Sequence, residues 1–390
     1  MRNPIILGVL VCLAVCLGAA AQGGHLAATR EPLNLEALAK LDPASAAKSE
    51  DNKWAWYDAK ALTIEGKGWT DTEAFYHRFP AKAKGVVPDP VWNLSTSTAG
   101  MCARFVTNAN RIGARWTTSS ANLGMPHMPA TGVSGLDLYV NDAGVWRWIG
   151  NGRPAAQTNE QTLADGIPDG WHEYIVYFPL YNGLTSLEIG VQPEAALAQP
   201  PARPAGREKP MVFYGTSILQ GGCASRPGMA HTSILGRWLD RPALNFGFSG
   251  NGKMEMEIEA LLAEIDAAVY VLDCIPNMGS EMVTERLEPF VVALRQALPD
   301  TPIVLVENIR YQAGAFLPAS RTAYESKNQA LKEAYARLVA QGVAGLTYVP
   351  CDNLLGDDGE ATVDGTHCTD LGYCRMAETL EPVLRGILEP

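Results

Sequence analysis

The sequence predicts an all-β domain followed by an α/β domain with a parallel sheet. At 390 residues the chain is longer than one ordinary domain requires. Apolar runs in the first half are short and alternating, whereas those in the second half alternate with helical stretches. Between the halves, residues 192–210 read QPEAALAQPPARPAGREKP, which is typical of a linker or an extended crossing segment. We therefore expect one domain over 25–191, a linker over 192–209 and a second domain over 210–390.

Residues 1–21 are predicted to be a cleavable secretory signal. Arg2 supplies a positive charge, residues 5–17 form an apolar core, and the small residues that follow allow cleavage near Ala21. The core is short for a membrane span, so a membrane anchor is the weaker alternative. A lipoprotein site needs a small residue before its cysteine, and Val15 precedes Cys16. We therefore expect a secreted or periplasmic protein.

Composition limits the possible partners. Hydrophobic residues make up 47% and charged residues 19%, which is a globular composition. The net charge is −11, and the sequence has no Lys/Arg cluster that would offset it locally. Such a surface repels phosphate backbones and anionic lipid. We expect no nucleic-acid partner and no membrane span in the mature chain.

Six cysteines remain once the signal is removed. An even number in an exported protein permits disulfides, and we expect one or two. No C-x-x-C or H-x-H spacing points to zinc, so no metal site is predicted. The six are Cys102, Cys223, Cys274, Cys351, Cys368 and Cys374.

The first half has the pattern of an antiparallel β-sandwich. Gly, Asn, Asp and Pro separate its short apolar runs, and few helical periods occur. Residues 141–144, Asn-Asp-Ala-Gly, suggest a hairpin turn between two of the runs. The predicted strands cover residues 61–65, 102–106, 135–140, 145–149 and 173–178.

The second half has the pattern of βαβ units. Strands that alternate with helices form a parallel sheet covered on both faces, and its sites lie at the carboxyl ends of the strands. The predicted strands are 210–214, 243–248, 268–272, 302–306 and 346–349. The predicted helices are 229–239, 254–265, 281–298, 326–340 and 371–388.

Four segments that directly follow these strands carry chemically useful residues. Ser217 lies in the first strand-to-helix loop, where a serine is either a nucleophile or a helix cap. Gly250 leaves a backbone N–H unshielded, and Asn277 can donate its amide to an oxyanion, although both residue types also form plain turns. Asp364 precedes His367 by three residues, so its carboxylate can accept from one ring nitrogen while the other faces a serine. All four segments should meet at one rim.

This order of residues resembles the SGNH (GDSL-like) hydrolase superfamily. Ser217, Gly250 and Asn277 match its first three motifs, and Asp364 with His367 matches the fourth, D-x-x-H. The first motif here reads GTSI instead of GDSL, and the third reads IPNM instead of GxND. The resemblance implies a flavodoxin-like three-layer domain and a serine esterase.

A second resemblance covers the first half. Residues 135–139 read Gly-Leu-Asp-Leu-Tyr, which is similar to the G-x-D-L-Y signature of the β-rich domain that precedes certain bacterial SGNH esterases. A jelly-roll-like domain before an SGNH domain is also the arrangement of several carbohydrate esterases that remove acetyl groups. By analogy, this similarity implies an acetylated carbohydrate or another small ester as substrate.

The resemblance also implies a mechanism. His367 takes the Ser217 proton, Asp364 fixes the histidine tautomer, and Ser217 attacks the ester carbonyl. The oxyanion would be held by the backbone N–H groups of Ser217 and Gly250 and by the Asn277 amide. No cofactor and no metal is expected.

Several residues and alternatives remain open. His127 is either a substrate contact or a structural histidine, and the roles of Cys223 and Arg226 near the nucleophile are undecided. Rival functions are a lipase, thioesterase or phospholipid acetylhydrolase, and a non-catalytic carbohydrate-binding protein on an SGNH scaffold. Four tryptophans could form a sugar-stacking platform or pack in the core: Trp54, Trp56, Trp69 and Trp92.

Overall fold

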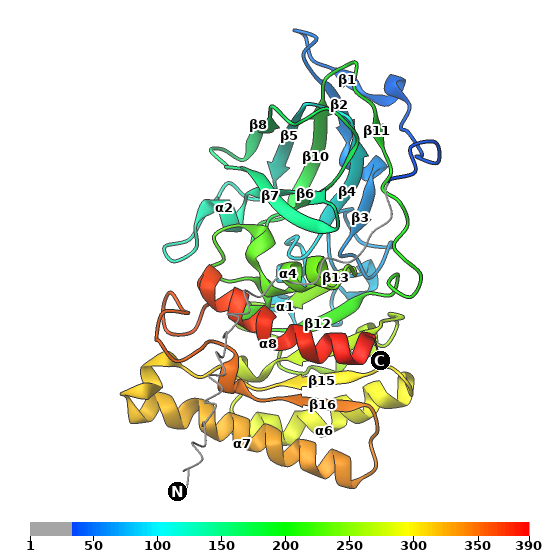
Figure 1. Ribbon diagram of the computed structural model, residues 1–390. Helices are drawn as coiled ribbons and strands as arrows, with labels where there is room; N and C mark the ends of the chain where they lie inside the picture. The colour runs from blue at the N-terminus through cyan, green and yellow to red at the C-terminus, as the bar shows by residue number, and fades with distance from the viewer. Residues whose placement is uncertain (1–32, 390) are drawn as a thin grey trace, which may run out of the picture.

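The structure is a computed structural model that describes residues 33–389. The predicted signal sequence, residues 1–21, lies outside the described residues. Figure 1 shows the β-rich part of the chain above an α/β part that ends at the C-terminus. The predicted fold class, an all-β domain before an α/β domain, is confirmed. Within residues 33–389, no helix combines the length and the apolar character that a bilayer crossing needs.

Two antiparallel sheets form the N-terminal part. Their orders are β1-β2-β10-β5-β8 and β11-β4-β9-β6-β7, with β3 beside β4. Side chains from both sheets enter one shared core, in which Phe105, Trp116 and Tyr174 are almost fully buried. The strands are β1 Ala47–Lys48, β2 Ala55–Asp58, β3 Thr63–Glu65, β4 Cys102–Thr107, β5 Arg111–Thr118, β6 Leu136–Asp142, β7 Val145–Gly152, β8 Thr158–Asp165, β9 His172–Tyr177, β10 Leu184–Val191 and β11 Leu197–Ala198.

The C-terminal part contains one parallel sheet of order β13-β12-β14-β15-β16. The order places the second strand of this part beside the first, which is the flavodoxin-like arrangement. Its strands are β12 Met211–Gly215, β13 Ala243–Gly247, β14 Val269–Asp273, β15 Ile303–Val306 and β16 Leu346–Val349.

Helices cover both faces of this sheet. Alternate strand residues enter two cores: Val212 and Tyr214 face α5 to α7, and Met211 and Phe213 face α4 and α8. Figure 1 shows α6 and α7 on one side of β15 and β16, and α8 on the other. The helices of the C-terminal part are α3 Ser217–Gln220, α4 His231–Trp238, α5 Met256–Leu262, α6 Ser280–Ala297, α7 Pro318–Ala340 and α8 Asp370–Leu388, and those of the N-terminal part are α1 Asp89–Ser95 and α2 Ala130–Val133.

The segment over residues 192–209 is extended and packed along both parts. Its strand β11 pairs with β4, and Leu197 and Ala198 are fully buried. Arg203 then donates to the Glu65 carboxylate at 2.6 Å and to Asp240 at 2.7 Å. These contacts fix the crossing segment in place.

The G-x-D-L-Y residues lie at the contact between the two parts. Asp137 is fully buried and accepts from Arg226 Nη1 at 2.7 Å and from the Gly228 N–H at 2.9 Å. Trp148 Nε1 donates to its other oxygen, and Arg226 also donates to Tyr139. The signature therefore anchors the loop that follows the Ser217 helix, and Arg226 braces this loop.

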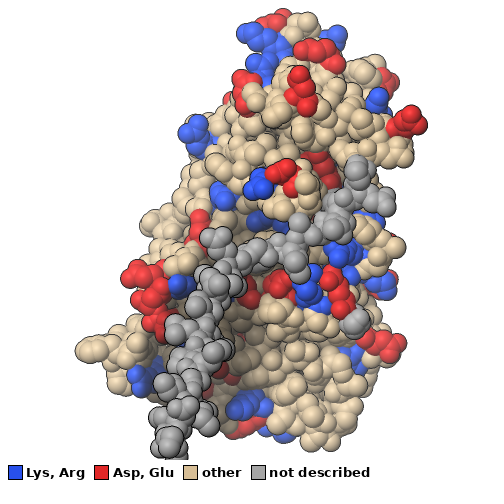
Figure 2. Space-filling view, viewed as in Figure 1, with Lys and Arg blue, Asp and Glu red and all other residues tan. Residues whose placement is uncertain are grey.

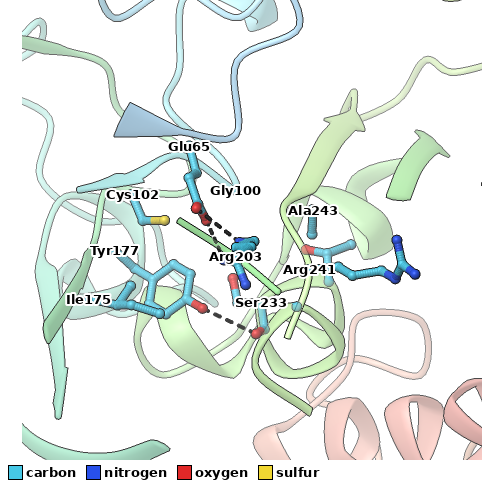
Figure 3. Close-up of a pocket in the computed structure, with 11 residues that line it drawn as sticks. Glu65, Gly100, Cys102, Ile175, Tyr177, Arg203, Ser233, Arg241 and Ala243 are labelled. Carbon is cyan, nitrogen blue, oxygen red and sulfur yellow. Dashed lines mark hydrogen bonds and ion pairs between the residues drawn. The ribbon is translucent and has the colours of Figure 1, made fainter. Parts of the chain in front are cut away.

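A small cavity also lies between the two parts (Figure 3). Tyr177 from the β-rich part donates to the Ser233 carbonyl across it, and Arg203 meets Glu65 at its edge. Its volume of about 20 Å³ leaves room for roughly one water, so it is no substrate site.

The expected disulfides are absent, and that prediction is wrong. All six cysteines between residues 33 and 389 are free, and five of them are buried. Cys274 packs in one core of the C-terminal part, Cys351 and Cys368 in the other, and Cys102 and Cys223 in two separate small clusters. Cys102, Cys274, Cys351 and Cys368 act as small apolar side chains in the interior.

Charges of both signs alternate on the surface. On the face shown in Figure 2, Lys and Arg are interspersed with Asp and Glu, without a broad basic patch.

Candidate active site

The rim at the carboxyl ends of the strands brings the predicted residues together. Ser217 directly follows β12, Gly250 follows β13, and Asn277 follows β14. Asp364 and His367 lie in the loop between β16 and α8. The rim is therefore at the point where the strand order reverses, between β12 and its two neighbours.

The loop geometry explains why Ser217 begins a helix. Thr216 has extended backbone angles, and its hydroxyl accepts from the Ile218 N–H at the start of α3. Gly221, at φ 106°, ends this helix after one turn. Gly215 lies so close to the Asp273 carbonyl that a Cβ would stand 2.3 Å from it. The tight turn presents the Ser217 side chain at the rim.

Two hydrogen bonds connect Ser217, His367 and Asp364 in that order. His367 Nε2 lies 2.8 Å from Ser217 Oγ, and His367 Nδ1 lies 2.7 Å from Asp364 Oδ2. Ser217 is 6% exposed, and the side chains of His367 and Asp364 are 19% and 37% exposed. The serine is thus shielded while the histidine remains open to the rim.

Asp364 is held as a carboxylate by its own loop. Its Oδ1 accepts from the backbone N–H groups of Thr366 at 3.0 Å and His367 at 2.8 Å. Partial burial raises the pKa of Asp364, but these bonds and the bond from the His367 ring outweigh it and lower that pKa to about 2. A negative charge therefore faces His367 Nδ1 throughout the neutral range.

Gly250 and Asn277 lie in the segments that follow the neighbouring strands β13 and β14. Gly250 adopts φ 72°, is exposed, and would place a Cβ more than 4 Å from any atom beyond its two chain neighbours. Asn277 Nδ2 donates one hydrogen to the Asn251 carbonyl at 2.7 Å. A primary amide carries two hydrogens, so the second is available to a ligand.

Groups that the sequence did not single out hold the backbone around Ser217. Tyr181 Oη donates to the Ser217 carbonyl at 2.9 Å, from the β-rich part of the chain. The Gly222 N–H donates to the same carbonyl at 2.9 Å. Gln220 is fully buried; its Nε2 donates to the Leu180 carbonyl, and its Oε1 accepts from the Ser249 N–H. No spacing rule links Tyr181 to a serine 36 positions later in the chain.

His127 and Cys223 also lie at the rim. The His127 ring centroid is 5.6 Å from that of His367, and the His127 side chain is exposed. Cys223, in the loop after α3, has its sulfur close to both histidines and to Asp364.

The tryptophans do not make a shared platform near the rim. Trp56 and Trp92 are buried. Trp54 packs against Trp56, and Trp69 packs against Phe79. Trp69 and Trp92 pack on the core that lies under α5 to α7 of the C-terminal part, whereas Trp54 and Trp56 pack against Arg111 and Arg115.

Asp273 is a buried carboxyl below the rim. It is 4% exposed, and its Oδ2 has no hydrogen-bond partner among the described residues. Burial raises the pKa of Asp273 to about 8, so the group is mostly protonated at neutral pH.

Two families match the two parts of the chain. The GDSL-like Lipase/Acylhydrolase family matches residues 208–385, and the family described as the N-terminus of Esterase_SGNH_hydro-type matches residues 54–197. No curated protein matches the chain.

Several solved structures are similar to this chain over most of its length. A Bacteroides ovatus protein described as a GDSL-like lipase is 38% identical, with a TM-score of 0.82 over 86% of this chain and 98% of its own. A salicylyl-acyltransferase from a tetracycline biosynthetic pathway is 20% identical, with a TM-score of 0.68 over 84% and 96%. A family two carbohydrate esterase from Cellvibrio japonicus is 14% identical, with a TM-score of 0.54 over 86% and 98%. At these lower identities the last two show a shared fold.

The fold and the matched families define the class of this protein, an SGNH-type hydrolase with a β-rich domain ahead of it. The chain belongs to the GDSL-like lipase/acylhydrolase (SGNH hydrolase) family, and it carries the GxDLY N-terminal domain.

Proposed function

We propose that the protein is a secreted serine esterase that hydrolyses short-chain esters, chiefly acetyl esters on carbohydrates. The observation that carries the proposal is the hydrogen-bonded chain of Ser217, His367 and Asp364 at the rim. Nucleophile, base and orienting carboxylate are the three groups that acyl transfer through a serine requires.

In the first half of the reaction, His367 Nε2 accepts the Ser217 proton as Oγ attacks the ester carbonyl carbon. Asp364 accepts from Nδ1–H and stabilises the imidazolium that forms. The tetrahedral intermediate collapses, the alcohol leaves with the proton from His367, and the acyl group stays on Ser217. Water then attacks this ester, His367 takes its proton, and the acid leaves as Ser217 is restored.

Three donors are available for the oxyanion: the N–H groups of Ser217 and Gly250, and the second Asn277 hydrogen. Ser217 begins α3, and Gly250 is exposed with open space around its Cα, which supports a role for both backbone N–H groups. Each such donor typically stabilises the transition state by roughly 3–4 kcal/mol.

The carbohydrate part of the proposal rests on similarity of architecture. Structures of family two carbohydrate esterases from Cellvibrio japonicus and Clostridium thermocellum share the fold over 75–86% of this chain. An acetyl xylan esterase from Butyrivibrio proteoclasticus also shares it, over 86%. Secretion is supported by the signal pattern of residues 1–21.

One observation favours a second candidate, an esterase for longer acyl chains. Val363, beside Asp364, is 49% exposed, and Phe316 is 88% exposed. The loops that carry them are joined by a hydrogen bond of 2.8 Å from Thr362 to Gln312. Apolar side chains near the rim could contact an acyl tail.

A hydrolysis series with p-nitrophenyl esters of increasing chain length separates the candidates. We expect turnover of the acetate, a steep fall for longer chains, and release of acetate from acetylated polysaccharides. Preference for long chains would replace the proposal with the second candidate. No turnover of any ester above the Ser217→Ala background would overturn both and leave the binding-protein alternative.

A further inference from the structure

Four metal-ligating side chains meet at the rim from three distant segments of the chain. His127 comes from the β-rich domain, Cys223 from the loop after α3, and Asp364 and His367 from the loop before α8. One ligand atom from each lies within 4.8 Å of those of the other three. Two imidazoles, a thiol and a carboxylate form the donor set that Zn²⁺ prefers, whereas Ca²⁺ and Mg²⁺ prefer oxygen alone.

His127 lies in a short closed loop beside His367. The loop that bears it is closed by two backbone hydrogen bonds between Met125 and Met128, of 2.9 and 3.1 Å. Met128 is buried and packs with Val133 and Cys223 in one small cluster. Within residues 33–389 no hydrogen bond engages the His127 ring, so both of its nitrogens are available.

Cys223 is held in an unusual conformation below His367. Its φ of 70° lies in the left-handed region, which a residue with a Cβ enters at a cost of roughly 1–3 kcal/mol. Gly222 before it is so close to the catalytic histidine that a Cβ there would stand 2.9 Å from His367 Cδ2. The chain therefore brings the Cys223 sulfur close to the histidine ring, although no step of the proposed ester hydrolysis uses a thiol.

We propose that His127, Cys223, Asp364 and His367 form a Zn²⁺ site that inhibits the enzyme and spans the two domains. On binding, the Cys223 thiol loses its proton to solvent and coordinates as thiolate, and the imidazoles coordinate as neutral ligands. No electron transfer is involved.

The site would act as a switch because His367 has only two nitrogens. One contacts Ser217 and the other contacts Asp364. A cation on Nε2 removes the base that accepts the serine proton, and a cation on Nδ1 displaces the Asp364 bond that sets the tautomer. Either arrangement stops catalysis, and chelation restores it. The inhibition rests on the proposed function, whereas the binding of metal does not.

Binding is tested on the metal-free mature protein with Zn²⁺ alone, by titration calorimetry. We expect one tight site in the wild type. The variants His127→Ala and Cys223→Ser should each bind at least about 10–100-fold more weakly, the range seen when even outer-shell partners of a metal are lost. His172→Ala serves as the matched control, since His172 lies on β9 and bonds the Pro168 carbonyl. Circular dichroism verifies that each variant is folded.

Substitution of Co²⁺ for Zn²⁺ gives a readout independent of activity. A thiolate-to-cobalt charge-transfer band should appear in the wild type and in Ser217→Ala, and should be missing in Cys223→Ser. Zinc should also inhibit ester hydrolysis, and the rate of each variant is compared with its own rate without metal. His127→Ala should need at least tenfold more zinc than wild type for the same inhibition.

The outcomes separate the two proposals. Zinc binding and the cobalt band in a protein without esterase activity would uphold the metal site and remove the proposed function. No zinc binding by the wild type, or binding that neither His127→Ala nor Cys223→Ser weakens, would overturn the metal site whatever the esterase activity.

Discussion

His367 Nε2 lies 2.8 Å from Ser217 Oγ, although the two residues are 150 positions apart in the chain. The contact exists because β12 and the loop before α8 end at the same edge of the parallel sheet. The first predictions concern the groups around this pair.

Asp364→Asn should lower kcat roughly 10⁴-fold, because an amide cannot keep the proton on His367 Nδ1 as the carboxylate does. Steady-state hydrolysis of p-nitrophenyl acetate measures the effect. Asp357→Asn, in the same exposed stretch of loops, is the matched control and should retain wild-type rates. A variant Asp364→Asn with near-normal kcat would reduce the site to a Ser217–His367 dyad.

Asn277→Ala should lower kcat roughly 10²–10³-fold with little change in KM, because the lost amide acts on the charge that develops in the transition state. The kinetic constants on one short-chain ester provide the measurement. Asn353→Ala, in the loop after β16, is a control with the same chemical change away from the rim. A rise in KM at constant kcat would instead make Asn277 a ground-state substrate contact.

Tyr181→Phe removes the hydroxyl that reaches the Ser217 carbonyl across the domain contact. The free energy of unfolding should fall by about 0.5–1.5 kcal/mol, as for one neutral hydrogen bond, and kcat should fall more than KM changes. Urea unfolding and steady-state kinetics on the same variant test this expectation. Unchanged kinetics with lower stability would limit Tyr181 to holding the two domains together.

Asp273 should make stability depend on pH. Burial raises the pKa of Asp273 from 3.8 to about 8, so between these values the unfolded chain loses a proton that the folded protein keeps. The free energy of unfolding therefore falls as pH rises, by up to about 1.4 kcal/mol per pH unit from this group. Asp273→Asn abolishes this term, so the stability of the variant relative to wild type should increase from pH 4 to pH 8.

Urea denaturation of both proteins across that range gives the difference directly. Asp266→Asn is a control, since Asp266 is exposed and pairs with Lys209. A stability difference between Asp273→Asn and wild type that is constant with pH would mean that Asp273 is ionised in the folded protein.

The fold could be predicted because its signals are local. The run over residues 269–272 is apolar and short enough to be a buried strand, and Thr369 before α8 is a regular helix cap that accepts from the Gly372 N–H. Most boundaries differ by one to three residues, and the largest difference is at the start of α7. Helix α7 begins at Pro318, eight residues before the predicted start, because a proline at the first turn favours the helix and the polar residues that follow have no apolar period.

Only part of the candidate site could be predicted from the sequence. Ser217, Gly250 and Asn277 each follow a strand, and this pattern can be recognised in the sequence. The topology of the sheet then places these strand ends at one edge. Tyr181 and His127 reach the rim from the other domain, and no spacing in the sequence encodes that contact. The even number of cysteines suggests pairing, whereas their separation as free thiols can be seen only in three dimensions.

The most direct test of the central claim, that Ser217 is the nucleophile of ester hydrolysis, is the rate of p-nitrophenyl acetate hydrolysis by wild type and Ser217→Ala. Ser326→Ala, an exposed serine on α7, is the control. The account predicts turnover by wild type and by the control, and a loss of roughly 10⁴–10⁶-fold in kcat for Ser217→Ala. Equal rates for wild type and Ser217→Ala would contradict it.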